Sequence, residues 1–303
     1  MTVPKVSVII PAYNHERFIG PAVESVLNQT HAELELIVID DGSTDNTGEV
    51  VKNFQDSRLR YVHQENQDAY NALNNGLALA SGEFVAILNS DDIYAANRLE
   101  TLLKEQQASG AQCLFTKIEA IDDEGRRLDD PELWWNRWYA DAVARCLAAP
   151  DLYTGFLQRN ALVTTSNFFL TRQAVETVGR FCPLRYLHDY DYMFRVLLAF
   201  PGRVRFLHDM PLLLYRIHGG NTISEAAITG REQDMAVIKK YMLARIPEEL
   251  QAVVAAGSNR LAELERELAE ERLRRNPPLP GIRAQAKNLV KSCIRRLWAG
   301  LTR

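Results

Sequence analysis

The sequence has few cysteines and no long hydrophobic run. Its four cysteines, Cys113, Cys146, Cys182 and Cys293, are widely spaced and form no C-x-x-C pair. This spacing gives no sign of a cysteine-ligated metal, and it predicts inert, mostly buried thiols in a reducing compartment. No run approaches the roughly 18 apolar residues that a membrane-spanning helix needs. The first apolar run, residues 6–10, is too short for a signal peptide and ends at a proline.

The chain also lacks an excess of charge of either sign. It has 35 Lys and Arg against 39 Asp and Glu, which gives a formal net charge of −4. Because proteins that bind nucleic acid usually carry a strongly basic surface, we expect no nucleic-acid partner. The composition, 47% hydrophobic and 24% charged over 303 residues, predicts a globular protein with a large core in one or two domains.

Apolar runs alternate with helical spacing over the first part of the chain. Residues 6–10, 34–39, 59–63 and 84–89 each form a short apolar run bounded by turn residues, which is typical of buried strands. Strands that alternate with helices predict a parallel sheet with right-handed crossovers. The predicted fold class is therefore α/β, Rossmann-like, with a mostly parallel sheet flanked by helices and a helical extension at the C-terminus.

The remaining segments are expected to extend this fold. Further strands are predicted at 112–121, 165–170, 204–207 and 212–217, and helices at 97–109, 173–178, 188–200, 225–245 and 248–275. Between them, residues 132–160 concentrate aromatic side chains among polar ones. This segment is interpreted either as a helical insert that packs on the sheet or as an aromatic wall for an acceptor sugar.

Polar residues follow three of the predicted strands. Pro11, Ala12, Tyr13 and Asn14 end the first strand, Asp40 and Asp41 end the second, and residues 89–92 end the fourth. Because the carboxyl ends of parallel strands lie at one edge of a sheet, these loops are expected to line one cleft. Adjacent carboxylates there can hold a hard divalent cation, which in turn holds phosphate oxygens. The alternative is that Asp91 and Asp92 only cap a turn or the next helix.

Suppose that this cleft binds a sugar nucleotide. Cleavage of the sugar–phosphate bond leaves a diphosphate, whose charge Mg²⁺ or Mn²⁺ would stabilise, with Asp92 as first ligand and Asp91 reaching the metal or the ribose. The attacking hydroxyl must lose a proton, and Asp189 or Asp191 could accept it as general base. Both aspartates could instead cap the helix that they open. His218, beside a Gly-Gly loop, could bind metal or diphosphate, or be structural.

Four ordered segments share their pattern with a known family. They are Val6-Ser-Val-Ile-Ile-Pro-Ala-Tyr-Asn14, Asp40-Asp41-Gly-Ser-Thr-Asp45, Ala72-Leu-Asn-Asn-Gly76 and Ala80-Ser-Gly-Glu-Phe-Val-Ala-Ile-Leu-Asn-Ser-Asp-Asp92. The pattern resembles family-2 inverting glycosyltransferases with the GT-A fold. The resemblance extends to about residue 224, and four motifs in order are far more specific than a lone Gly-rich loop. It implies sugar transfer with inversion, most often in the synthesis of bacterial cell-surface glycans.

The resemblance also implies roles for individual residues. Nucleotide contacts would come from Pro11, Ala12, Tyr13, Asn14, Asp41, Asn74 and Asp91. The metal would be held by Asp92, Asp91 and His218, the last in Tyr215-Arg-Ile-His218, which is similar to the family's Tyr-Arg-x-His. The segment His188-Asp-Tyr-Asp-Tyr192 is similar to the family's Glu-Asp-Tyr-Asp-Leu, which places the base on Asp189.

Two positions depart from the family's pattern. Asn89 stands where many members have Asp, but one branch of the family reads Leu-Asn-Ser-Asp-Asp, so metal binding is still expected. His188 replaces the usual Glu and could change the pKa of Asp189. Both Asp189 and Asp191 therefore remain candidates for the base.

The extent of the resemblance and the composition of the last residues predict the domain organisation. We predict a GT-A domain over 1–224, divided into a nucleotide-binding half (about 1–95) and an acceptor half (96–224), then a helical extension over 225–276 and a Pro-rich linker with a basic amphipathic helix over 277–303. Residues 282–303 have no acidic side chain and are expected to adsorb to an anionic membrane surface. A cytoplasmic protein would then lie on the inner face of the cell membrane. The alternative is a helix that docks on the protein's own body.

The predicted function is transfer of one sugar from a UDP- or dTDP-sugar to a hydroxyl of a glycan, lipid-linked or protein acceptor. The mechanism would be a metal-assisted single displacement with an Asp general base. One rival is a nucleotidyltransferase, but such enzymes usually carry a Gly-rich loop with Arg and Lys after the first strand, where this chain has Pro-Ala-Tyr-Asn-His-Glu. A second rival is a non-catalytic sugar-nucleotide-binding protein, which would need Asp41 and Asp92 but not Asp189.

Overall fold

The first part of the chain forms parallel strands joined by helices. The computed structural model describes residues 5–219 and 229–275. The first elements are β1 (Val6–Ala12), α1 (Ile19–Leu27), β2 (Leu34–Asp40), α2 (Thr47–Lys52), β3 (Leu59–His63), α3 (Ala69–Leu79) and β4 (Phe84–Ile87). β1 pairs in parallel with β2 and β4, and β2 pairs in parallel with β3. The four parallel strands predicted from the sequence are therefore confirmed.

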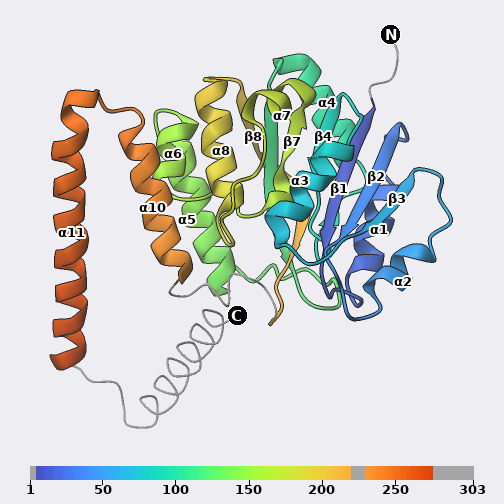
Figure 1. Ribbon diagram of the computed structural model, residues 1–303, viewed down its shortest axis with the longest axis horizontal. Helices are drawn as coiled ribbons and strands as arrows, with labels where there is room; N and C mark the ends of the chain where they lie inside the picture. Colours follow the sequence, from blue (N-terminus) through green and yellow to red (C-terminus); the bar gives the residue numbers. More distant parts are fainter. Residues whose placement is uncertain (1–4, 220–228, 276–303) are drawn as a thin grey trace. The chain divides into compact units, whose positions relative to one another are not determined.

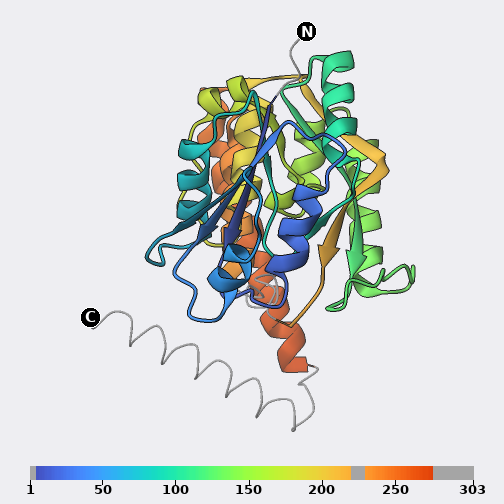
Figure 2. The same cartoon turned by 90° about the vertical axis from the view of Figure 1, so that its right-hand side faces the viewer.

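β1 is apolar on both of its faces because helices cover both faces of the sheet (Figure 1, Figure 2). Val8 and Ile10 belong to a core shared with α1, whereas Ile9 belongs to a core shared with α3. α3 approaches β1 closely at Gly76, where an added Cβ atom would stand 2.3 Å from Cγ2 of Ile9. Glycine at this position therefore allows the close packing that places α3 on the sheet.

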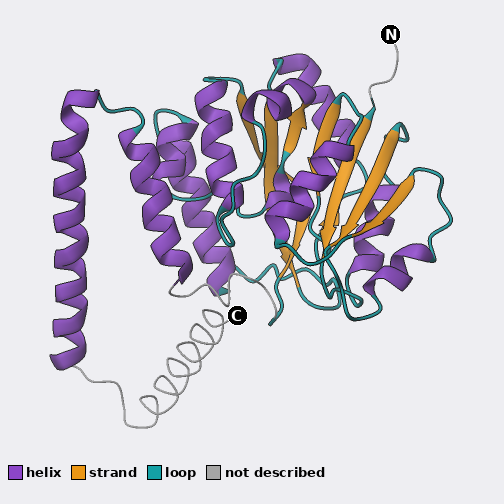
Figure 3. Cartoon of the chain, in the orientation of Figure 1, coloured by secondary structure: helices purple, strands orange, loops and turns teal. Residues whose placement is uncertain are grey.

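The second part of the chain extends the sheet with strands of both directions. Its elements are β5 (Ile93–Tyr94), α4 (Arg98–Ser109), β6 (Cys113–Ile121), α5 (Trp134–Ala148), α6 (Leu152–Gln158), η1 (Thr165–Asn167), β7 (Phe169–Thr171), α7 (Arg172–Val178), α8 (His188–Ala199) and β8 (Val204–Arg216). β7 runs antiparallel to β4 and β6, and β5 runs antiparallel to β8. The strand order is β3-β2-β1-β4-β7-β6-β8-β5. Figure 3 shows the strands in orange with the helices in purple beside them. The sheet is mostly parallel, as predicted, with two reversed strands.

Three predicted strand segments differ from the structure. Residues 165–170 begin as the 3-10 turn η1, which the Thr164 side chain caps, and only Phe169–Thr171 form a strand. Residues 204–207 and 212–217 belong to one strand, β8, rather than two. Its register against β6 shifts between Thr116 and Ile118, so a bulge absorbs the polar residues that interrupt the apolar pattern.

The aromatic segment forms α5 and α6, which confirms the helical interpretation of residues 132–160. Trp135 and Tyr139 are buried with ring centroids 5.1 Å apart, and the Tyr139 hydroxyl accepts a hydrogen bond from the Ile118 N–H of β6 at 3.0 Å. The insert therefore packs on the sheet. Trp134 is 62% exposed, and a contact between it and an acceptor sugar stays a prediction.

The chain divides into two compact units, Met1–Tyr241 and Met242–Arg303. In α10 (Thr229–Leu243), Val237 and Tyr241 are buried, and the Tyr241 ring stacks on Phe194 of α8 at 4.5 Å. The predicted helical extension thus contributes α10 to the core of the first unit. The second unit contains α11 (Glu248–Arg275), and no helix in the described ranges is long and apolar enough to span a membrane. The predicted linker and basic helix at 277–303 lie outside the described residues.

Candidate active site

The carboxyl ends of β1 and β2 are joined at one edge of the sheet. The Asp41 N–H donates to the carbonyl of Ala12 at 2.8 Å. The Asp41 carboxylate is buried, and its Oδ1 accepts hydrogen bonds from Gln64 Nε2 at 2.7 Å and from Gln67 N at 2.9 Å. Burial raises the pKa of Asp41. Tyr13, which follows Ala12, is 47% exposed and so open to a ligand at the same edge.

Asn14 fastens the loop after β1 to the loop after β2. Its φ angle is 50°, its Oδ1 accepts from the Thr44 N–H at 2.8 Å, and its own N–H donates to Ser43 Oγ at 3.0 Å. Pro11 lies within the sheet, paired with Ile39 of β2. These bonds give Asn14 a positioning role in the loop, whether or not it also contacts a nucleotide.

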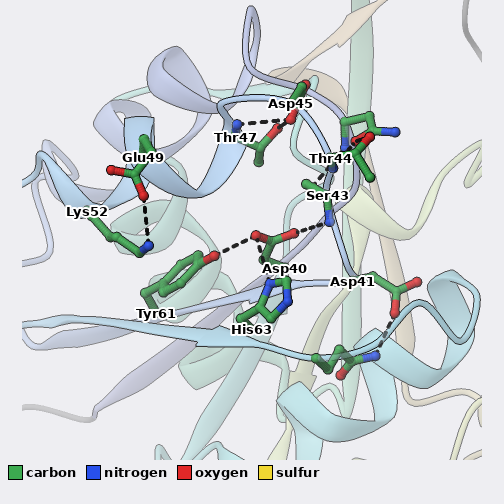
Figure 4. A network of polar contacts seen from close by, with 12 residues as sticks. Asp40, Asp41, Ser43, Thr44, Asp45, Thr47, Glu49, Lys52, Tyr61 and His63 are labelled. Atoms are coloured by element: carbon green, nitrogen blue, oxygen red, sulfur yellow. Dashed lines mark hydrogen bonds and ion pairs between the residues drawn. The ribbon is translucent and has the colours of Figure 1, made fainter.

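The Asp40 side chain stabilises the same loop through hydrogen bonds (Figure 4). Its Oδ1 accepts from the Ser43 N–H at 2.9 Å, and its Oδ2 accepts from the Tyr61 hydroxyl at 2.5 Å and lies 3.3 Å from His63 Nδ1. Burial would raise the pKa of Asp40, but the hydrogen bonds from Ser43 and Tyr61 outweigh it and lower the pKa. Of the two adjacent carboxylates, Asp40 therefore holds the loop and Asp41 is the one better placed for a ligand.

Three side chains from separate loops converge on a cluster that could hold a cation. Asp91 Oδ2 lies 3.1 Å from His218 Nε2, and His15 Nδ1 lies 2.7 Å from Ser90 Oγ. One candidate ligand atom from each of His15, Asp91 and His218 lies within 4.8 Å of the other two. Burial lowers the pKa of His15, which favours the neutral imidazole that metals bind. One carboxylate and two imidazoles at this spacing form a donor set for a divalent cation.

Asp92 is fully buried and both of its oxygens are bonded within the fold. Oδ2 accepts from Ser166 Oγ at 2.5 Å, and Oδ1 accepts from the Arg216 N–H at 3.0 Å. Burial and the neighbouring charge of Asp91 raise the pKa of Asp92. Burial would also raise the pKa of Asp91, but the hydrogen bond with His218 outweighs that effect and lowers the pKa. The geometry therefore favours Asp91 over Asp92 as a metal ligand, in contrast to the first choice made from the sequence.

Arg216 and Asn89 hold the surrounding loops in place. Arg216 Nε donates to the carbonyl of Asp91 at 2.8 Å. Asn89 Nδ2 donates to Thr164 Oγ1 at 2.9 Å, and Asn89 Oδ1 accepts from Thr165 Oγ1 at 2.7 Å. An ionised aspartate at position 89 could not make the first of these bonds, because it has no donor. The asparagine that departs from the family's pattern thus has a structural role.

Asp189 and Asp191 both lie in the first turn of α8, but their surroundings differ. Asp189 is buried, and burial raises its pKa to about 7. Asp191 forms ion pairs with Lys240 and Arg195, each at 2.8 Å, and accepts from the Tyr241 hydroxyl at 2.7 Å. Burial of Asp191 would raise its pKa, but these partners lower it to about 2. Asp189 is therefore the better proton acceptor near neutral pH.

Tyr215 connects Asp189 with the loop after β4. The side chain lies on β8 and is buried. Burial raises the pKa of the Tyr215 hydroxyl, and the charges of Asp92, Asp91 and Asp189 raise it further. Asp92, Asp91 and Asp189 therefore all lie close enough to influence the Tyr215 hydroxyl.

Asn74 makes its contacts inside the protein. Its Nδ2 donates to the Phe181 carbonyl at 3.0 Å, and its Oδ1 accepts from the Phe181 N–H at 2.7 Å. The side chain is 5% exposed. These bonds tie α3 to the segment that leads into α8, so the geometry favours a positioning role for Asn74 over the expected nucleotide contact.

Comparison with known sequences identifies the family. The profile described as "Glycosyl transferase family 2" matches residues 7–161. The uncharacterized glycosyltransferase alr2836 of Nostoc sp. is 32% identical over 235 residues, which is 76% of this chain and 70% of the relative. The chain belongs to glycosyl transferase family 2. This membership confirms that the protein is a glycosyltransferase.

Two further comparisons concern one relative and one solved structure. The UDP-Glc:alpha-D-GlcNAc-diphosphoundecaprenol beta-1,3-glucosyltransferase WfgD of Escherichia coli is 36% identical over 146 residues, and this match spans 47% of the chain but only 58% of WfgD. TarS 1–349 of S. aureus, solved with UDP-GlcNAc, aligns with a TM-score of 0.62 at 22% identity over 82% of this chain and 69% of that chain. The second likeness confirms the GT-A fold.

Sequence reasoning missed one residue of this family 2 site. His15 was not singled out, because a lone histidine in a loop has no spacing that marks it as a ligand. The signal that could have found it is its position directly after Asn14, at the strand end where the cleft was expected.

Proposed function

We propose that this glycosyltransferase moves a sugar from a UDP- or dTDP-sugar to an acceptor hydroxyl with inversion. Asp189 would act as the general base, and Asp91 and His218 would hold a divalent cation. The observation that carries the proposal is the approach of Asp91 and His218, with Oδ2 and Nε2 3.1 Å apart, in a chain of glycosyl transferase family 2. A buried Asp189 with a pKa of about 7 supports its assignment as the proton acceptor.

The donor set fits Mg²⁺ or Mn²⁺. Neighbouring ligands on an octahedral ion with bonds of about 2.1 Å are separated by roughly 3 Å, and Asp91 Oδ2 and His218 Nε2 are 3.1 Å apart. A cation bound there would supply charge neutralisation for the diphosphate leaving group. Asp92, although expected as a ligand, contributes by fixing the loop that carries Asp91.

Asp189 would accept the proton of the attacking hydroxyl. In a single displacement the acceptor oxygen bonds to the anomeric carbon as the bond to the diphosphate breaks, so the configuration inverts. A base with a pKa near the working pH combines an available deprotonated form with enough basicity. The alternative base, Asp191, is ionised but too weakly basic, because its ion pairs lower its pKa to about 2.

The edge formed by β1 and β2 would bind the nucleotide. Asp41 lies against Ala12, with Pro11 and the exposed Tyr13 on either side of Ala12 in the chain, and we assign this group to the nucleobase. The UDP-sugars in the names of WfgD and the TarS complex support a uridine diphosphate donor. Asp91 would reach the cation, the ribose or both.

The acceptor would be a hydroxyl of a glycan, a lipid-linked sugar or a protein. A lipid-linked acceptor is supported by the name of WfgD, which specifies a diphosphoundecaprenol-linked sugar. It also fits the basic, acid-free sequence of residues 282–303, which would bring a cytoplasmic enzyme to the inner membrane surface. The exposed Trp134 offers a ring on which an acceptor sugar could stack.

Donor hydrolysis tests this function without knowledge of the acceptor. We would measure UDP release from UDP-Glc and UDP-GlcNAc with Mn²⁺ for wild type, Asp189→Asn and Asp129→Asn, the last an exposed control. Loss of the base should lower the rate by about 10²–10⁴-fold. UDP affinity, measured by calorimetry, should stay the same in all three proteins. Unchanged hydrolysis in Asp189→Asn would remove Asp189 from the mechanism.

A further inference from the structure

His15 lies beside the two residues assigned to the cation. One of its ring nitrogens is within 4.8 Å of ligand atoms on both Asp91 and His218, and its ring centroid is 5.8 Å from that of His218. The three side chains come from the loop after β1, the loop after β4 and the end of β8. Residues so distant in sequence converge here because the strands that carry them belong to one sheet.

The His15 ring is also held in a fixed orientation. Its Nδ1 lies 2.7 Å from Ser90 Oγ, and its face is bordered by Phe18 at a centroid distance of 5.9 Å. Histidines that bind metals usually bond through their second ring nitrogen to a neighbouring polar group, which sets the tautomer and the ring plane. Ser90, adjacent to Asp91 in the chain, occupies that supporting position.

We propose that His15 is a third protein ligand of the cation, and that its imidazole strengthens the binding of Mn²⁺ more than that of Mg²⁺. This inference rests on the cation site of the proposed function. Mg²⁺ favours oxygen ligands and usually keeps several waters, whereas imidazole nitrogen suits later divalent metals. Two imidazoles and one carboxylate supply more nitrogen than Mg²⁺ favours, so the protein itself discriminates between the ions. Three ligands also allow Mn²⁺ to bind without a nucleotide.

The test titrates Mn²⁺ alone into the full chain and follows free Mn²⁺ by electron paramagnetic resonance. We compare wild type with His15→Ala and with His31→Ala, a matched loop histidine that lies near the Glu33 carbonyl. His15→Ala should weaken Mn²⁺ binding by about 10-fold or more, while His31→Ala should bind as wild type does. Mg²⁺, measured by competition, should lose less affinity than Mn²⁺ in His15→Ala, so the preference for Mn²⁺ shrinks.

A second readout counts the ligands directly. Electron spin-echo modulation of bound Mn²⁺ should show two imidazole nitrogens in wild type and one in the His15 variant. If His15→Ala does not fold, His15→Gln replaces it, because its amide can still bond to Ser90 but supplies no imidazole.

Three results would overturn the inference. The first is wild-type Mn²⁺ affinity in His15→Ala while Asp91→Asn has lost binding, which leaves a two-residue site and the proposed function intact. The second is a single imidazole nitrogen in the wild-type spectrum. The third is an absence of Mn²⁺ binding by the wild-type chain at millimolar concentration. The proposed function fails by a different result, unchanged hydrolysis in Asp189→Asn, so the two failures can be told apart.

Discussion

Asp189 and Asp191 lie in the same turn of α8, yet their pKa values are shifted in opposite directions, to about 7 and about 2. Burial is the main cause of the raised pKa of Asp189. At Asp191 the effect of burial on the pKa is outweighed by Lys240, Tyr241 and Arg195. The contrast separates a group suited to accept a proton from a group suited to hold two helices together.

The first prediction concerns pH. Because the folded-state pKa of Asp189 is raised above its ordinary value of 3.8 to about 7, the folded protein binds a proton that the unfolded chain releases. The contribution of Asp189 to the free energy of unfolding should therefore fall as pH rises from about 4 to about 7. Activity should rise over the upper part of this range, with an apparent pKa near 7.

The variant Asp189→Asn tests the predicted effect on stability. By about pH 8 the variant should be more stable than wild type by roughly 1–3 kcal/mol, because it buries no charge, and this advantage should shrink toward about pH 5. Thermal unfolding across this pH range provides the measurement. If the difference in stability between the variant and wild type did not change with pH, Asp189 would not be a buried, titrating carboxylate.

The second prediction concerns Asp191. Removing one partner of a buried ion pair costs about 3–5 kcal/mol, but the Lys240 side chain is 59% exposed and screened by water. Asp191→Asn should therefore lower the free energy of unfolding by roughly 2 kcal/mol in urea denaturation at neutral pH. Below its melting temperature it should hydrolyse donor at close to the wild-type rate. A loss of rate as large as that of Asp189→Asn would make Asp191 the base.

The pH dependence of Asp191 has the opposite sign from that of Asp189. Its folded-state pKa is depressed to about 2, so the stabilisation is present above the ordinary value of 3.8 and is lost as pH falls toward 2. The stability difference between wild type and Asp191→Asn should therefore shrink in acid. A difference that stayed constant down to about pH 2 would contradict the ion pairs.

The third prediction separates the two adjacent aspartates after β4. Asp91→Asn should abolish Mn²⁺ binding with little loss of stability, because the side chain of Asp91 bonds only His218 among the contacts described. Asp92→Asn should keep Mn²⁺ binding but lose roughly 1–3 kcal/mol, since an amide cannot accept both from Ser166 and from the Arg216 N–H. Mn²⁺ titration and denaturation of both variants give the answer. Lost Mn²⁺ binding in a folded Asp92→Asn would restore Asp92 as a ligand.

The fourth prediction concerns Asn74. Replacing it with Ala leaves the buried N–H and carbonyl of Phe181 without these partners, which should cost roughly 1–3 kcal/mol of stability. UDP affinity should remain within about twofold of wild type. Asn71→Ala on the same helix is the control, because within residues 5–219 and 229–275 its side chain bonds only the exposed Gln67 carbonyl. A large drop in UDP affinity without a loss of stability would support the nucleotide contact instead.

The sequence predicted the parallel strands and the polar strand ends because both depend on local patterns. An apolar run such as residues 34–39 followed by two aspartates specifies a buried strand and the loop after it. Whether Asp91 or Asp92 is the better metal ligand depends on which of them bonds to Ser166 and to the Arg216 N–H. Both of these partners are distant in sequence. The same limit applies to His15, whose partners are Asp91 and His218.

Local patterns also misled where tertiary contacts decide the backbone. Residues 165–170 contain Thr165, Phe168 and Phe169, which favour strands, but the Thr164 side chain caps a turn there and Asn89 bonds to Thr165. In β8, polar residues and a proline suggested a break, although pairing with β6 carries the strand through a bulge. Short β5 carries no sequence signal, because two residues are too few to show alternation.

The Arg216 N–H donates to Asp92 Oδ1. Asp92 follows Asp91, and Arg216 lies two positions before His218, so this bond joins the neighbours of the two proposed cation ligands. Folding alone thus brings Asp91 and His218 within reach of each other. The entropy of ordering these loops is lost during folding and not when the ion enters. Ion capture should then proceed without a slow rearrangement of the chain, and exchange of one metal for another should be governed by the ion's own water exchange.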